Sequence, residues 1–304
     1  MTILNQEHSK NWSLYNADCV ELMADMPDES IDYSIFSPPF AALYTFSDSL
    51  QDMSNCKTEQ EFYDQFLFAV DELHRILKPG RLVSCHCMQL TATNQSNGYI
   101  GLKDFRGDLI RIFQKAGFIF HSEVVIWKDP LLSAIRSKTH GLMHKQIVKD
   151  SSMCRQGLPD YVVTMRKTGE NYIPISHPEG LSEYAGFDPP TKGNLSHEIW
   201  HKYASPIWMD IRQGNTLNKA LAKENKDERH MTPLQLDVIE RCITLWSNPN
   251  DIVFSPFGGI GSEGYQAVKM GRKSVAVELK TSYYNVAVSN MRMIENAPKQ
   301  EELF

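Results

Sequence analysis

The chain has no hydrophobic run of membrane-spanning length and no paired cysteine motif. In its 304 residues, no apolar run approaches the roughly 18 residues that a transmembrane helix needs. The N-terminal segment also lacks the apolar core of a signal peptide. The six cysteines are scattered without a CxxC pair, which is typical of reduced thiols. We therefore expect a cytoplasmic protein without a membrane anchor.

A net positive charge, common in nucleic-acid-binding proteins, is also missing, because the formal net charge is −6. The length and the 42% hydrophobic content suit one large α/β domain or two smaller ones. The charge is uneven, however. Between residues 128 and 167, eight Lys or Arg residues stand against three Asp residues. This excess fits either a solvated loop or a surface that faces phosphates.

Short apolar runs alternate with amphipathic segments, a pattern typical of a largely parallel sheet with helices on both faces. Strands are predicted at residues 12–17, 31–36, 81–86, 118–127, 161–165, 251–255 and 274–279. Helices are predicted at residues 60–77, 107–116, 232–246, 265–270 and 282–294, with Pro233 at the first helical position of the third. Residues 168–229 show only weak periodicity and are too long for an ordinary connection, so they predict an irregular functional insertion or a disordered segment.

Two consecutive prolines end the second predicted strand, in the sequence Ser37-Pro38-Pro39-Phe40. Proline donates no ladder hydrogen bond and restricts the residue before it to extended or turn geometry. The result is a stiff tip with fixed carbonyl directions, followed by an aromatic ring. By itself the pattern also fits a loop that only ends a strand.

A glycine-rich segment lies between a predicted strand and a predicted helix near the end of the chain. Gly259, Gly261 and Gly264 spell G-x-G-x-x-G, and Glu278 follows at the end of the next strand. Such glycines let the backbone approach a ligand, and the acidic side chain can accept both ribose hydroxyls. A nicotinamide dehydrogenase is therefore one alternative. Too few residues follow Glu278 to complete a dinucleotide domain in normal order, so earlier strands must complete the sheet.

Two further patterns could indicate a metal site. His197, Glu198 and His201 match the H-E-x-x-H motif of zinc peptidases, although they lie in the irregular region and a polar surface segment is the other interpretation. In Cys85-His86-Cys87, strand alternation places both cysteines on one face and the histidine on the other. That arrangement is a poor chelate, and we predict no metal.

These motifs together resemble the β class of DNA amino-methyltransferases, which methylate an exocyclic base nitrogen with S-adenosylmethionine. The SPPF tip is similar to the family's (D/N/S)-P-P-(Y/F/W), and SPFGGIG at residues 255–261 to its D-P-F-x-G-x-G loop. The segments YNADCVELMADMPDESIDYSIF, LHRILKPGRLV, RHMTPLQLDVIERCI and VAVEL extend the likeness over nearly the whole chain. The chain departs from the family at Ser255, where Asp is usual, and in the proline spacing of the RHMTP segment.

The resemblance implies an α/β fold with the Rossmann-like sheet of class I methyltransferases, mostly parallel, with about seven strands and a circularly permuted order. Residues 1–167 would form the catalytic half, residues 168–206 a target-recognition insertion, and residues 207–304 the cofactor-binding half. The cofactor would be S-adenosylmethionine. Its contacts would come from Asp18 at the adenine amine, Glu278 at the ribose, and Phe257, Gly259 and Gly261.

The same resemblance assigns the catalytic residues Ser37, Pro38, Pro39 and Phe40. An exocyclic amine is a poor nucleophile, and a rigid tip can orient it by accepting its two hydrogens at the Ser37 hydroxyl and the Pro38 carbonyl. Phe40 would stack on a base flipped out of the duplex. Serine at the first position is more typical of enzymes that act on cytosine N4 than on adenine N6.

The expected partner is double-stranded DNA, with phosphate contacts from the basic residues Arg136, Lys138 and Lys145. A cognate restriction endonuclease could accompany the protein or be absent, and both a monomer and a homodimer remain open. The alternatives are an RNA or protein amide methyltransferase with the same tip, an inactive DNA-binding relative, the dehydrogenase and the zinc peptidase.

Overall fold

The computed structural model describes residues 2–39, 53–56, 58–131, 142, 144–152, 154–177, 197–218 and 233–297. Its strands are β1 (Asn5–His8), β2 (Trp12–Asn16), β3 (Ile31–Phe36), β4 (Leu77–Met88), β5 (Leu90–Ala92), β6 (Gly101–Lys103), β7 (Ile119–Ile126), β8 (Asp160–Arg166), β9 (Ile207–Trp208), β10 (Ile252–Ser255) and β11 (Lys273–Val277). Its helices are α1 (Cys19–Ala24), the 3₁₀ turn η1 (Met53–Asn55), α2 (Glu59–Ile76), α3 (Asn94–Asn97), α4 (Phe105–Lys115), α6 (His144–Lys149), α7 (His197–Ala204), α8 (Leu236–Trp246), α9 (Ser262–Lys269) and α10 (Thr281–Glu295).

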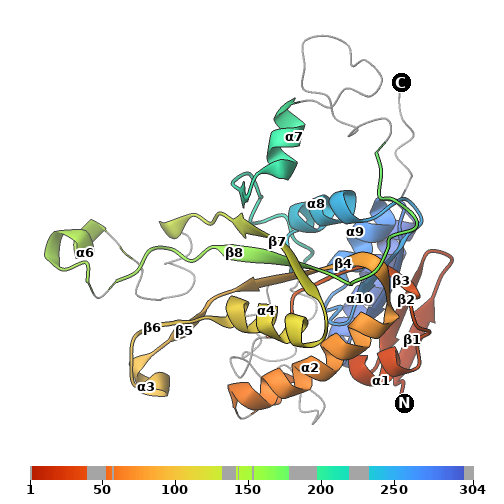
Figure 1. Ribbon diagram of the computed structural model, residues 1–304, viewed down its shortest axis with the longest axis horizontal. Helices are drawn as coiled ribbons and strands as arrows, with labels where there is room; N and C mark the ends of the chain where they lie inside the picture. The colour runs from red at the N-terminus through yellow and green to blue at the C-terminus, as the bar shows by residue number, and fades with distance from the viewer. Residues whose placement is uncertain are drawn as a thin grey trace.

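Nine strands form one sheet in the order β1-β2-β11-β10-β3-β4-β8-β7-β9 (Figure 1). The neighbours from β2 to β4 all run parallel, whereas β1 and β8 pair antiparallel with their neighbours. All seven predicted strands are present in this sheet, but the prediction of about seven strands for it was two too low. It missed β1, which is largely exposed and has no apolar alternation, and β9, which has only two residues.

The last two strands of the chain, β10 and β11, lie between β2 and β3. This confirms that strands from early in the sequence complete the sheet around the glycine-rich segment. Because β2, β11, β10, β3 and β4 are parallel, their carboxyl ends meet at one edge of the sheet, where ligands bind in open α/β folds.

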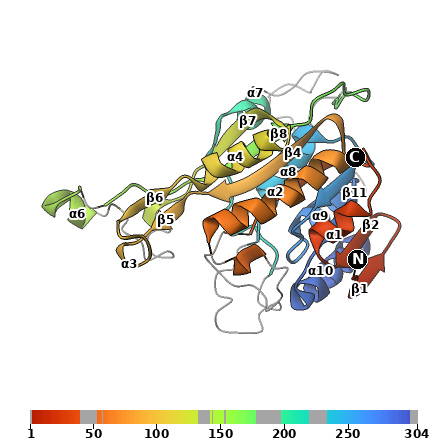
Figure 2. The same cartoon turned by 60° about the horizontal axis from the view of Figure 1, so that its bottom comes forward.

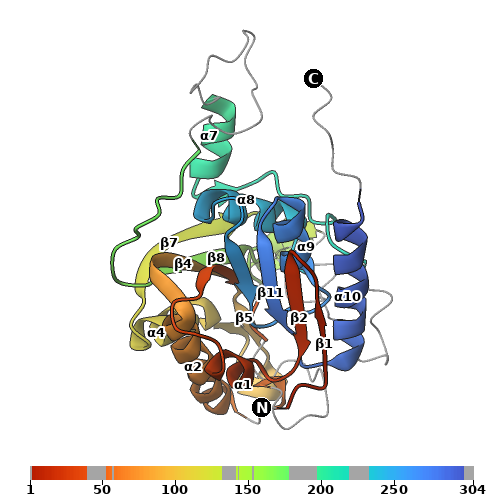
Figure 3. The same ribbon diagram turned by 90° about the vertical axis from the view of Figure 1, so that its right-hand side faces the viewer.

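Helices cover both faces of the sheet, as predicted (Figure 3). On one face, α1, α2 and α4 pack through a single apolar cluster, to which α2 contributes the predicted stripe of Phe62, Phe66, Val70 and Leu73. On the other face, α8 and α9 cover the middle of the sheet, and α10 packs on β2 and β11.

Helix α8 begins at Leu236, so the prediction that Pro233 occupies its first position was wrong. The residues just before the helix are extended and contact the segment around Asn215. The N–H of Leu236 donates to the carbonyl of Asn215, and Asp237 accepts from Arg212 and Asn215. These contacts replace the helical hydrogen bonds that the sequence predicted there.

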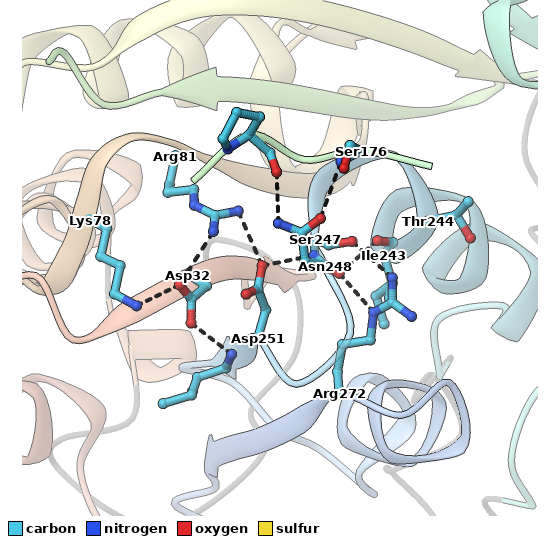
Figure 4. A network of polar contacts seen from close by, with 12 residues as sticks. Asp32, Lys78, Arg81, Ser176, Ile243, Thr244, Ser247, Asn248, Asp251 and Arg272 are labelled. Atoms are coloured by element: carbon cyan, nitrogen blue, oxygen red, sulfur yellow. Dashed lines mark hydrogen bonds and ion pairs between the residues drawn. The ribbon is translucent and has the colours of Figure 1, made fainter. Parts of the chain in front are cut away.

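A buried charge network ties together the amino ends of the central strands, opposite the carboxyl edge (Figure 4). The Arg81 guanidinium lies between two carboxylates, 3.1 Å from Asp251 and 3.5 Å from Asp32. Asp32 also contacts Lys78 at 2.6 Å and accepts the N–H of Ile252 at 2.9 Å. Buried charges require such partners, because removing one leaves an unpaired charge in the interior. The network therefore fixes β3, β4 and β10 relative to one another.

Two insertions project from the sheet at the same end of the molecule (Figures 1 and 2). One carries β5, α3 and β6 and follows the carboxyl end of β4, and the other carries α6 and connects β7 to β8. In the part of the chain that the structure describes, no helix is both long and apolar enough to cross a membrane. All six cysteines lie among the described residues, and none of them forms a disulfide bond.

Candidate active site

The predicted cofactor residues meet at the carboxyl edge of β2, β10 and β11. The Gly259 N–H donates to Glu278 Oε2 at 2.7 Å, and the Lys280 N–H donates to Oε1 at 2.9 Å. The Glu278 carboxylate thus joins the loop after β10 to the backbone that follows β11. Asn16, at the end of β2, donates to the carbonyls of Glu278 and Leu279, which joins the ends of β2 and β11.

Gly259 differs from the other glycines of its motif in the space around it. Gly259 and Gly261 both have φ in the left-handed region that favours glycine, +51° and +86°, but only a Cβ on Gly259 would have no atom within 4 Å. A Cβ on Gly261, in contrast, would lie 3.3 Å from Ala287 of α10, and one on Gly264 would lie 2.8 Å from the Ser274 hydroxyl of β11. Gly261 and Gly264 thus permit close packing of α9, while Gly259 presents an open backbone.

Asp18 lies on the strand end next to Glu278 and is the N-cap of α1. Its carboxylate accepts the N–H of Glu21 at 2.9 Å. Burial raises the pKa of Asp18, because the charged form loses hydration, although hydrogen bonds from Glu21 and Val20 oppose the shift. The residue is only partly buried, so its carboxylate remains accessible at the predicted cofactor site.

Phe257 anchors the loop between β10 and α9. Its ring packs 5.5 Å from that of Phe36, the last residue of β3, and 6.2 Å from that of Phe66 on α2, measured between ring centroids. The glycine loop is thus held against the strand that leads into the SPPF tip. Ser255, the last residue of β10, is buried and stands where the family usually has Asp.

Glu263, in the first turn of α9, is a buried carboxyl group close to this loop. Burial raises its pKa to about 8, and the neighbouring charge of Glu278 adds to the shift. The side chain therefore carries a proton at neutral pH.

The proline tip follows β3 directly, next to the end of β4. Strand pairing places Phe36 opposite Cys85, so the next residues of the two strands, Ser37 and His86, lie side by side. Ser37 Oγ is 3.0 Å from His86 Nδ1. Pro38 is buried and Pro39 partly buried. Phe40 lies outside the described residues.

His86 continues into a chain of polar contacts. Its Nε2 lies 3.2 Å from Asp160 Oδ2, at the start of β8, and the same oxygen is 2.5 Å from Lys128 Nζ. Burial by itself raises the pKa of Asp160, which is 2% exposed, but His86 and Lys128 outweigh this effect and hold the pKa below its ordinary value. Asp160 is therefore an anion that faces one cation and one imidazole.

Sequence reasoning missed this contact because it considered His86 only as a metal ligand. The alternation of side chains along this strand was predicted correctly, because Cys85 and Cys87 lie in the apolar core on the face of the sheet opposite to His86. The signal that could have revealed the contact is the pairing of the strands predicted at residues 31–36 and 81–86, which brings Ser37 next to His86.

The predicted phosphate-binding residues are only partly described. Lys145 is exposed on α6, together with Lys149, whereas Arg136 and Lys138 lie outside the described residues. The interpretation of the whole basic stretch as phosphate-facing was too broad. Lys128 pairs with Asp160, and the buried Lys167 donates to the carbonyl of Leu77 at 2.7 Å.

The H-E-x-x-H motif lies on the short helix α7, within a region that was predicted to be irregular. Residues 197–218 therefore contain more regular structure than expected, namely α7 and the edge strand β9. Among the residues that the structure describes, no three His, Cys, Asp or Glu side chains gather as ligands of one metal ion would.

The comparisons with known proteins agree with this arrangement of motifs. A family model for DNA methylases of the N6/N4 type matches residues 31–289. The chain belongs to this family. The methylase shares 25% identity with the Type II methyltransferase M.BglII of Bacillus subtilis, over 90% of its own length and 67% of M.BglII. It shares 25% identity with M.PvuII of Proteus hauseri, over 97% of its own length and 87% of M.PvuII.

Solved structures show the same fold. The cytosine-N4-specific PvuII DNA methyltransferase superposes with a TM-score of 0.65 at 19% identity, covering 97% of this methylase and 94% of that chain. TTHA0409 of Thermus thermophilus, solved with S-adenosyl-L-methionine, superposes with a TM-score of 0.63 at 19% identity, covering 95% and 97%. The methylase therefore has the class I methyltransferase fold, with a mixed, mostly parallel sheet.

The methylase is an S-adenosylmethionine-dependent enzyme of the DNA amino-methyltransferase family. Its own residues fit this cofactor: the backbone of Gly259 is open on one side, and the carboxylates of Glu278 and Asp18 lie on neighbouring strand ends. When bound, the sulfonium cofactor supplies an activated methyl group, so the protein contributes mainly orientation and electrostatics.

Proposed function

We propose that the enzyme methylates the exocyclic N4 amine of a cytosine flipped out of double-stranded DNA. The observation that carries the proposal is the position of Ser37, at the carboxyl end of β3 and next to β10, whose following loop contains Gly259. Methyl donor and target base would thus be held by adjacent strand ends. The proposed division is a catalytic half at residues 1–167, a target-recognition insertion at residues 168–206 and a cofactor half at residues 207–304, in permuted order.

In this proposal, the cofactor is bound through hydrogen bonds to its adenosine part. The Glu278 carboxylate accepts hydrogen bonds from the ribose hydroxyls, and the Asp18 carboxylate accepts one from the adenine amine. The open face of Gly259 permits close approach of the backbone. Phe257 and Gly261 hold the loop in place, through packing on Phe36 and through the start of α9.

The SPPF tip would orient the target amine. Ser37 Oγ and the Pro38 carbonyl each accept one amine hydrogen, which directs the nitrogen lone pair toward the sulfonium methyl group. Pro39 stiffens the tip, and Phe40 stacks on the flipped base. Ser37→Ala is expected to lower the turnover number while leaving the affinity for S-adenosylmethionine nearly unchanged.

DNA would be held at the same edge of the sheet. Both projecting insertions start from this edge, and the exposed Lys145 on α6 would contact phosphates together with Arg136 and Lys138. Residues 168–206 would read base edges in the major groove. The protein would act alone or as the methylating partner of a restriction endonuclease.

The choice of cytosine over adenine rests on Ser37. The relatives of the enzyme differ in their target base. The similar PvuII enzyme is cytosine-N4-specific, whereas YhdJ of Escherichia coli K12, 23% identical over 95% of this chain, is a DNA adenine methyltransferase. Serine at the first position of the tip favours cytosine N4, because aspartate or asparagine is more typical of enzymes for adenine N6.

The test is to incubate the protein with labelled S-adenosylmethionine and duplex DNA and to weigh the released nucleosides by mass spectrometry. The expected product is N4-methyldeoxycytidine. N6-methyldeoxyadenosine alone would contradict the choice of base and leave the orienting role of Ser37 standing. Label found only in RNA or protein substrates would contradict the proposal as a whole.

A further inference from the structure

We propose that His86, held by Asp160, receives through Ser37 the proton that the target amine loses during methylation. This inference rests on the proposed function and assigns a role to two residues outside the SPPF tip. It starts from the polar chain that joins Ser37, His86, Asp160 and Lys128 across β3, β4, β8 and the end of β7.

His86 Nε2 lies 3.2 Å from the ionised Asp160 carboxylate, although the two groups are not aligned as a formed hydrogen bond. Because a carboxylate can only accept, the proposal places the hydrogen of the neutral ring on Nε2. Nδ1 then has a free lone pair and accepts the Ser37 hydroxyl at 3.0 Å. The two oxygen lone pairs of Ser37 remain available to the target amine. The arrangement thus gives Ser37 a definite direction as donor and as acceptor.

The proposed step balances. As the bond between nitrogen and the methyl carbon forms, the bond between that carbon and sulfur breaks, and the sulfonium becomes a neutral thioether. The methylated nitrogen then carries an extra proton. One N–H proton passes to Ser37 Oγ while the hydroxyl proton of Ser37 passes to His86 Nδ1. The resulting imidazolium faces the Asp160 carboxylate, which stabilises its charge.

Lys128 keeps Asp160 ionised, so that His86 rather than Asp160 is the group that takes up the proton. Its ammonium lies 2.5 Å from the same Asp160 oxygen that faces His86, so it compensates the buried carboxylate before any proton arrives. Without that cation, the carboxylate in this buried position would itself bind a proton more readily. Because His86 and Asp160 act through Ser37, we regard both as positioning residues.

The test compares the single-turnover rate of methyl transfer to duplex DNA in the intact enzyme and in His86→Gln. Glutamine can still accept a hydrogen bond from Ser37 but cannot take up a proton. The expected result is a rate lower by about 100-fold or more, with the affinity for S-adenosylmethionine measured by calorimetry changed less than about twofold. His121→Gln on β7 is the matched control, because it makes the same change on an exposed part of the sheet, and it should keep the wild-type rate.

A second variant distinguishes proton transfer through His86 and Asp160 from a purely structural role of the two residues. Asp160→Asn should lower the rate by a similar factor, since a neutral amide no longer selects the tautomer or stabilises the imidazolium. The double variant His86→Gln/Asp160→Asn should then be no slower than His86→Gln alone, because the two residues act as a unit. His86→Asn replaces the glutamine variant if thermal unfolding shows that glutamine is not accommodated.

A folded His86→Gln protein with the wild-type rate would overturn the inference, as would a double variant whose loss is the product of the two single losses. Failure of the proposed function is a different result, because it is seen in the wild-type enzyme, which would then transfer no label to DNA.

Discussion

The backbone N–H of Gly259 lies 2.7 Å from Oε2 of Glu278, so the residue that follows β11 holds the loop that follows β10. One carboxylate thereby joins two adjacent strand ends and, on the proposed function, also binds the cofactor ribose. The first two predictions test this pair of residues separately.

Glu278→Ala should weaken binding of S-adenosylmethionine by roughly tenfold to 100-fold, since a hydrogen bond to a charged group contributes about 1.5–3 kcal/mol. Titration calorimetry measures the change. Glu170→Ala, which removes an exposed carboxylate at the other edge of the sheet, is the control and should leave the affinity unchanged. If a folded Glu278→Ala protein binds S-adenosylmethionine with the wild-type affinity, Glu278 does not bind the cofactor ribose.

Gly259→Ala should weaken cofactor binding, whereas Gly271→Ala should not. Both glycines have positive φ, +51° and +75°, and at both positions a Cβ would have no atom within 4 Å. Each substitution therefore carries a similar backbone strain of about 1–2 kcal/mol, which urea unfolding can measure. Only at Gly259 does the new methyl group enter the proposed cofactor site. If the two variants bind S-adenosylmethionine equally well, the open face of Gly259 has no role in binding.

Replacing Lys145 and Lys149 on α6 by Gln should flatten the salt dependence of DNA binding. Each phosphate contact contributes about 0.9 to the slope of log affinity against log salt, so losing both should reduce the slope by about 1.8. The control replaces two exposed lysines at the opposite edge of the sheet, Lys10 and Lys273. Fluorescence anisotropy at several salt concentrations gives both slopes, and equal slopes would show that α6 does not contact DNA.

Glu263 should make the protein less stable as the pH rises. The folded chain retains the proton on this carboxyl up to about pH 8, whereas the ordinary value is 4.5. Its contribution to the free energy of unfolding is therefore complete below pH 4.5 and is lost as the pH rises through about 8. Glu263→Gln imitates the protonated form and should remove this part of the pH dependence, with Glu170→Gln as the control. Parallel wild-type and Glu263→Gln curves of urea stability against pH would contradict the prediction.

Much of the fold was predictable because its central strands carry strong local signals. Ile31–Phe36 is apolar throughout most of its length and ends at prolines, and Phe62, Phe66 and Val70 repeat at helical spacing. The missed elements are those whose stability is not local. β1 is exposed and exists through its pairing with β2, and the start of α8 is displaced by contacts with Asn215.

The candidate site also has features that the sequence motifs predict and features that depend on contacts between distant segments. The proximity of Ser37 to the Gly259 loop follows from strand order, and the sequence motifs predict it. The contact between Ser37 and His86 depends on the register of two strands that α2 separates in the sequence, and no local pattern encodes that register. Similarly, Lys128 adds to the positive charge of residues 128–167 in the sequence, but in the fold it pairs with Asp160 at the start of β8, an acidic residue of the same stretch.

The position of β10 and β11 between β2 and β3 also constrains how the protein can fold during synthesis. Ser34 of β3 donates to the carbonyl of Phe254 in β10, which is 220 residues later in the sequence. Until those late strands leave the ribosome, β2 and β3 lack their central neighbours and expose unpaired edges. Such distant pairing slows folding, since a long loop must close before the contacts form. The nascent chain therefore completes its catalytic tip and its cofactor loop in the same late step.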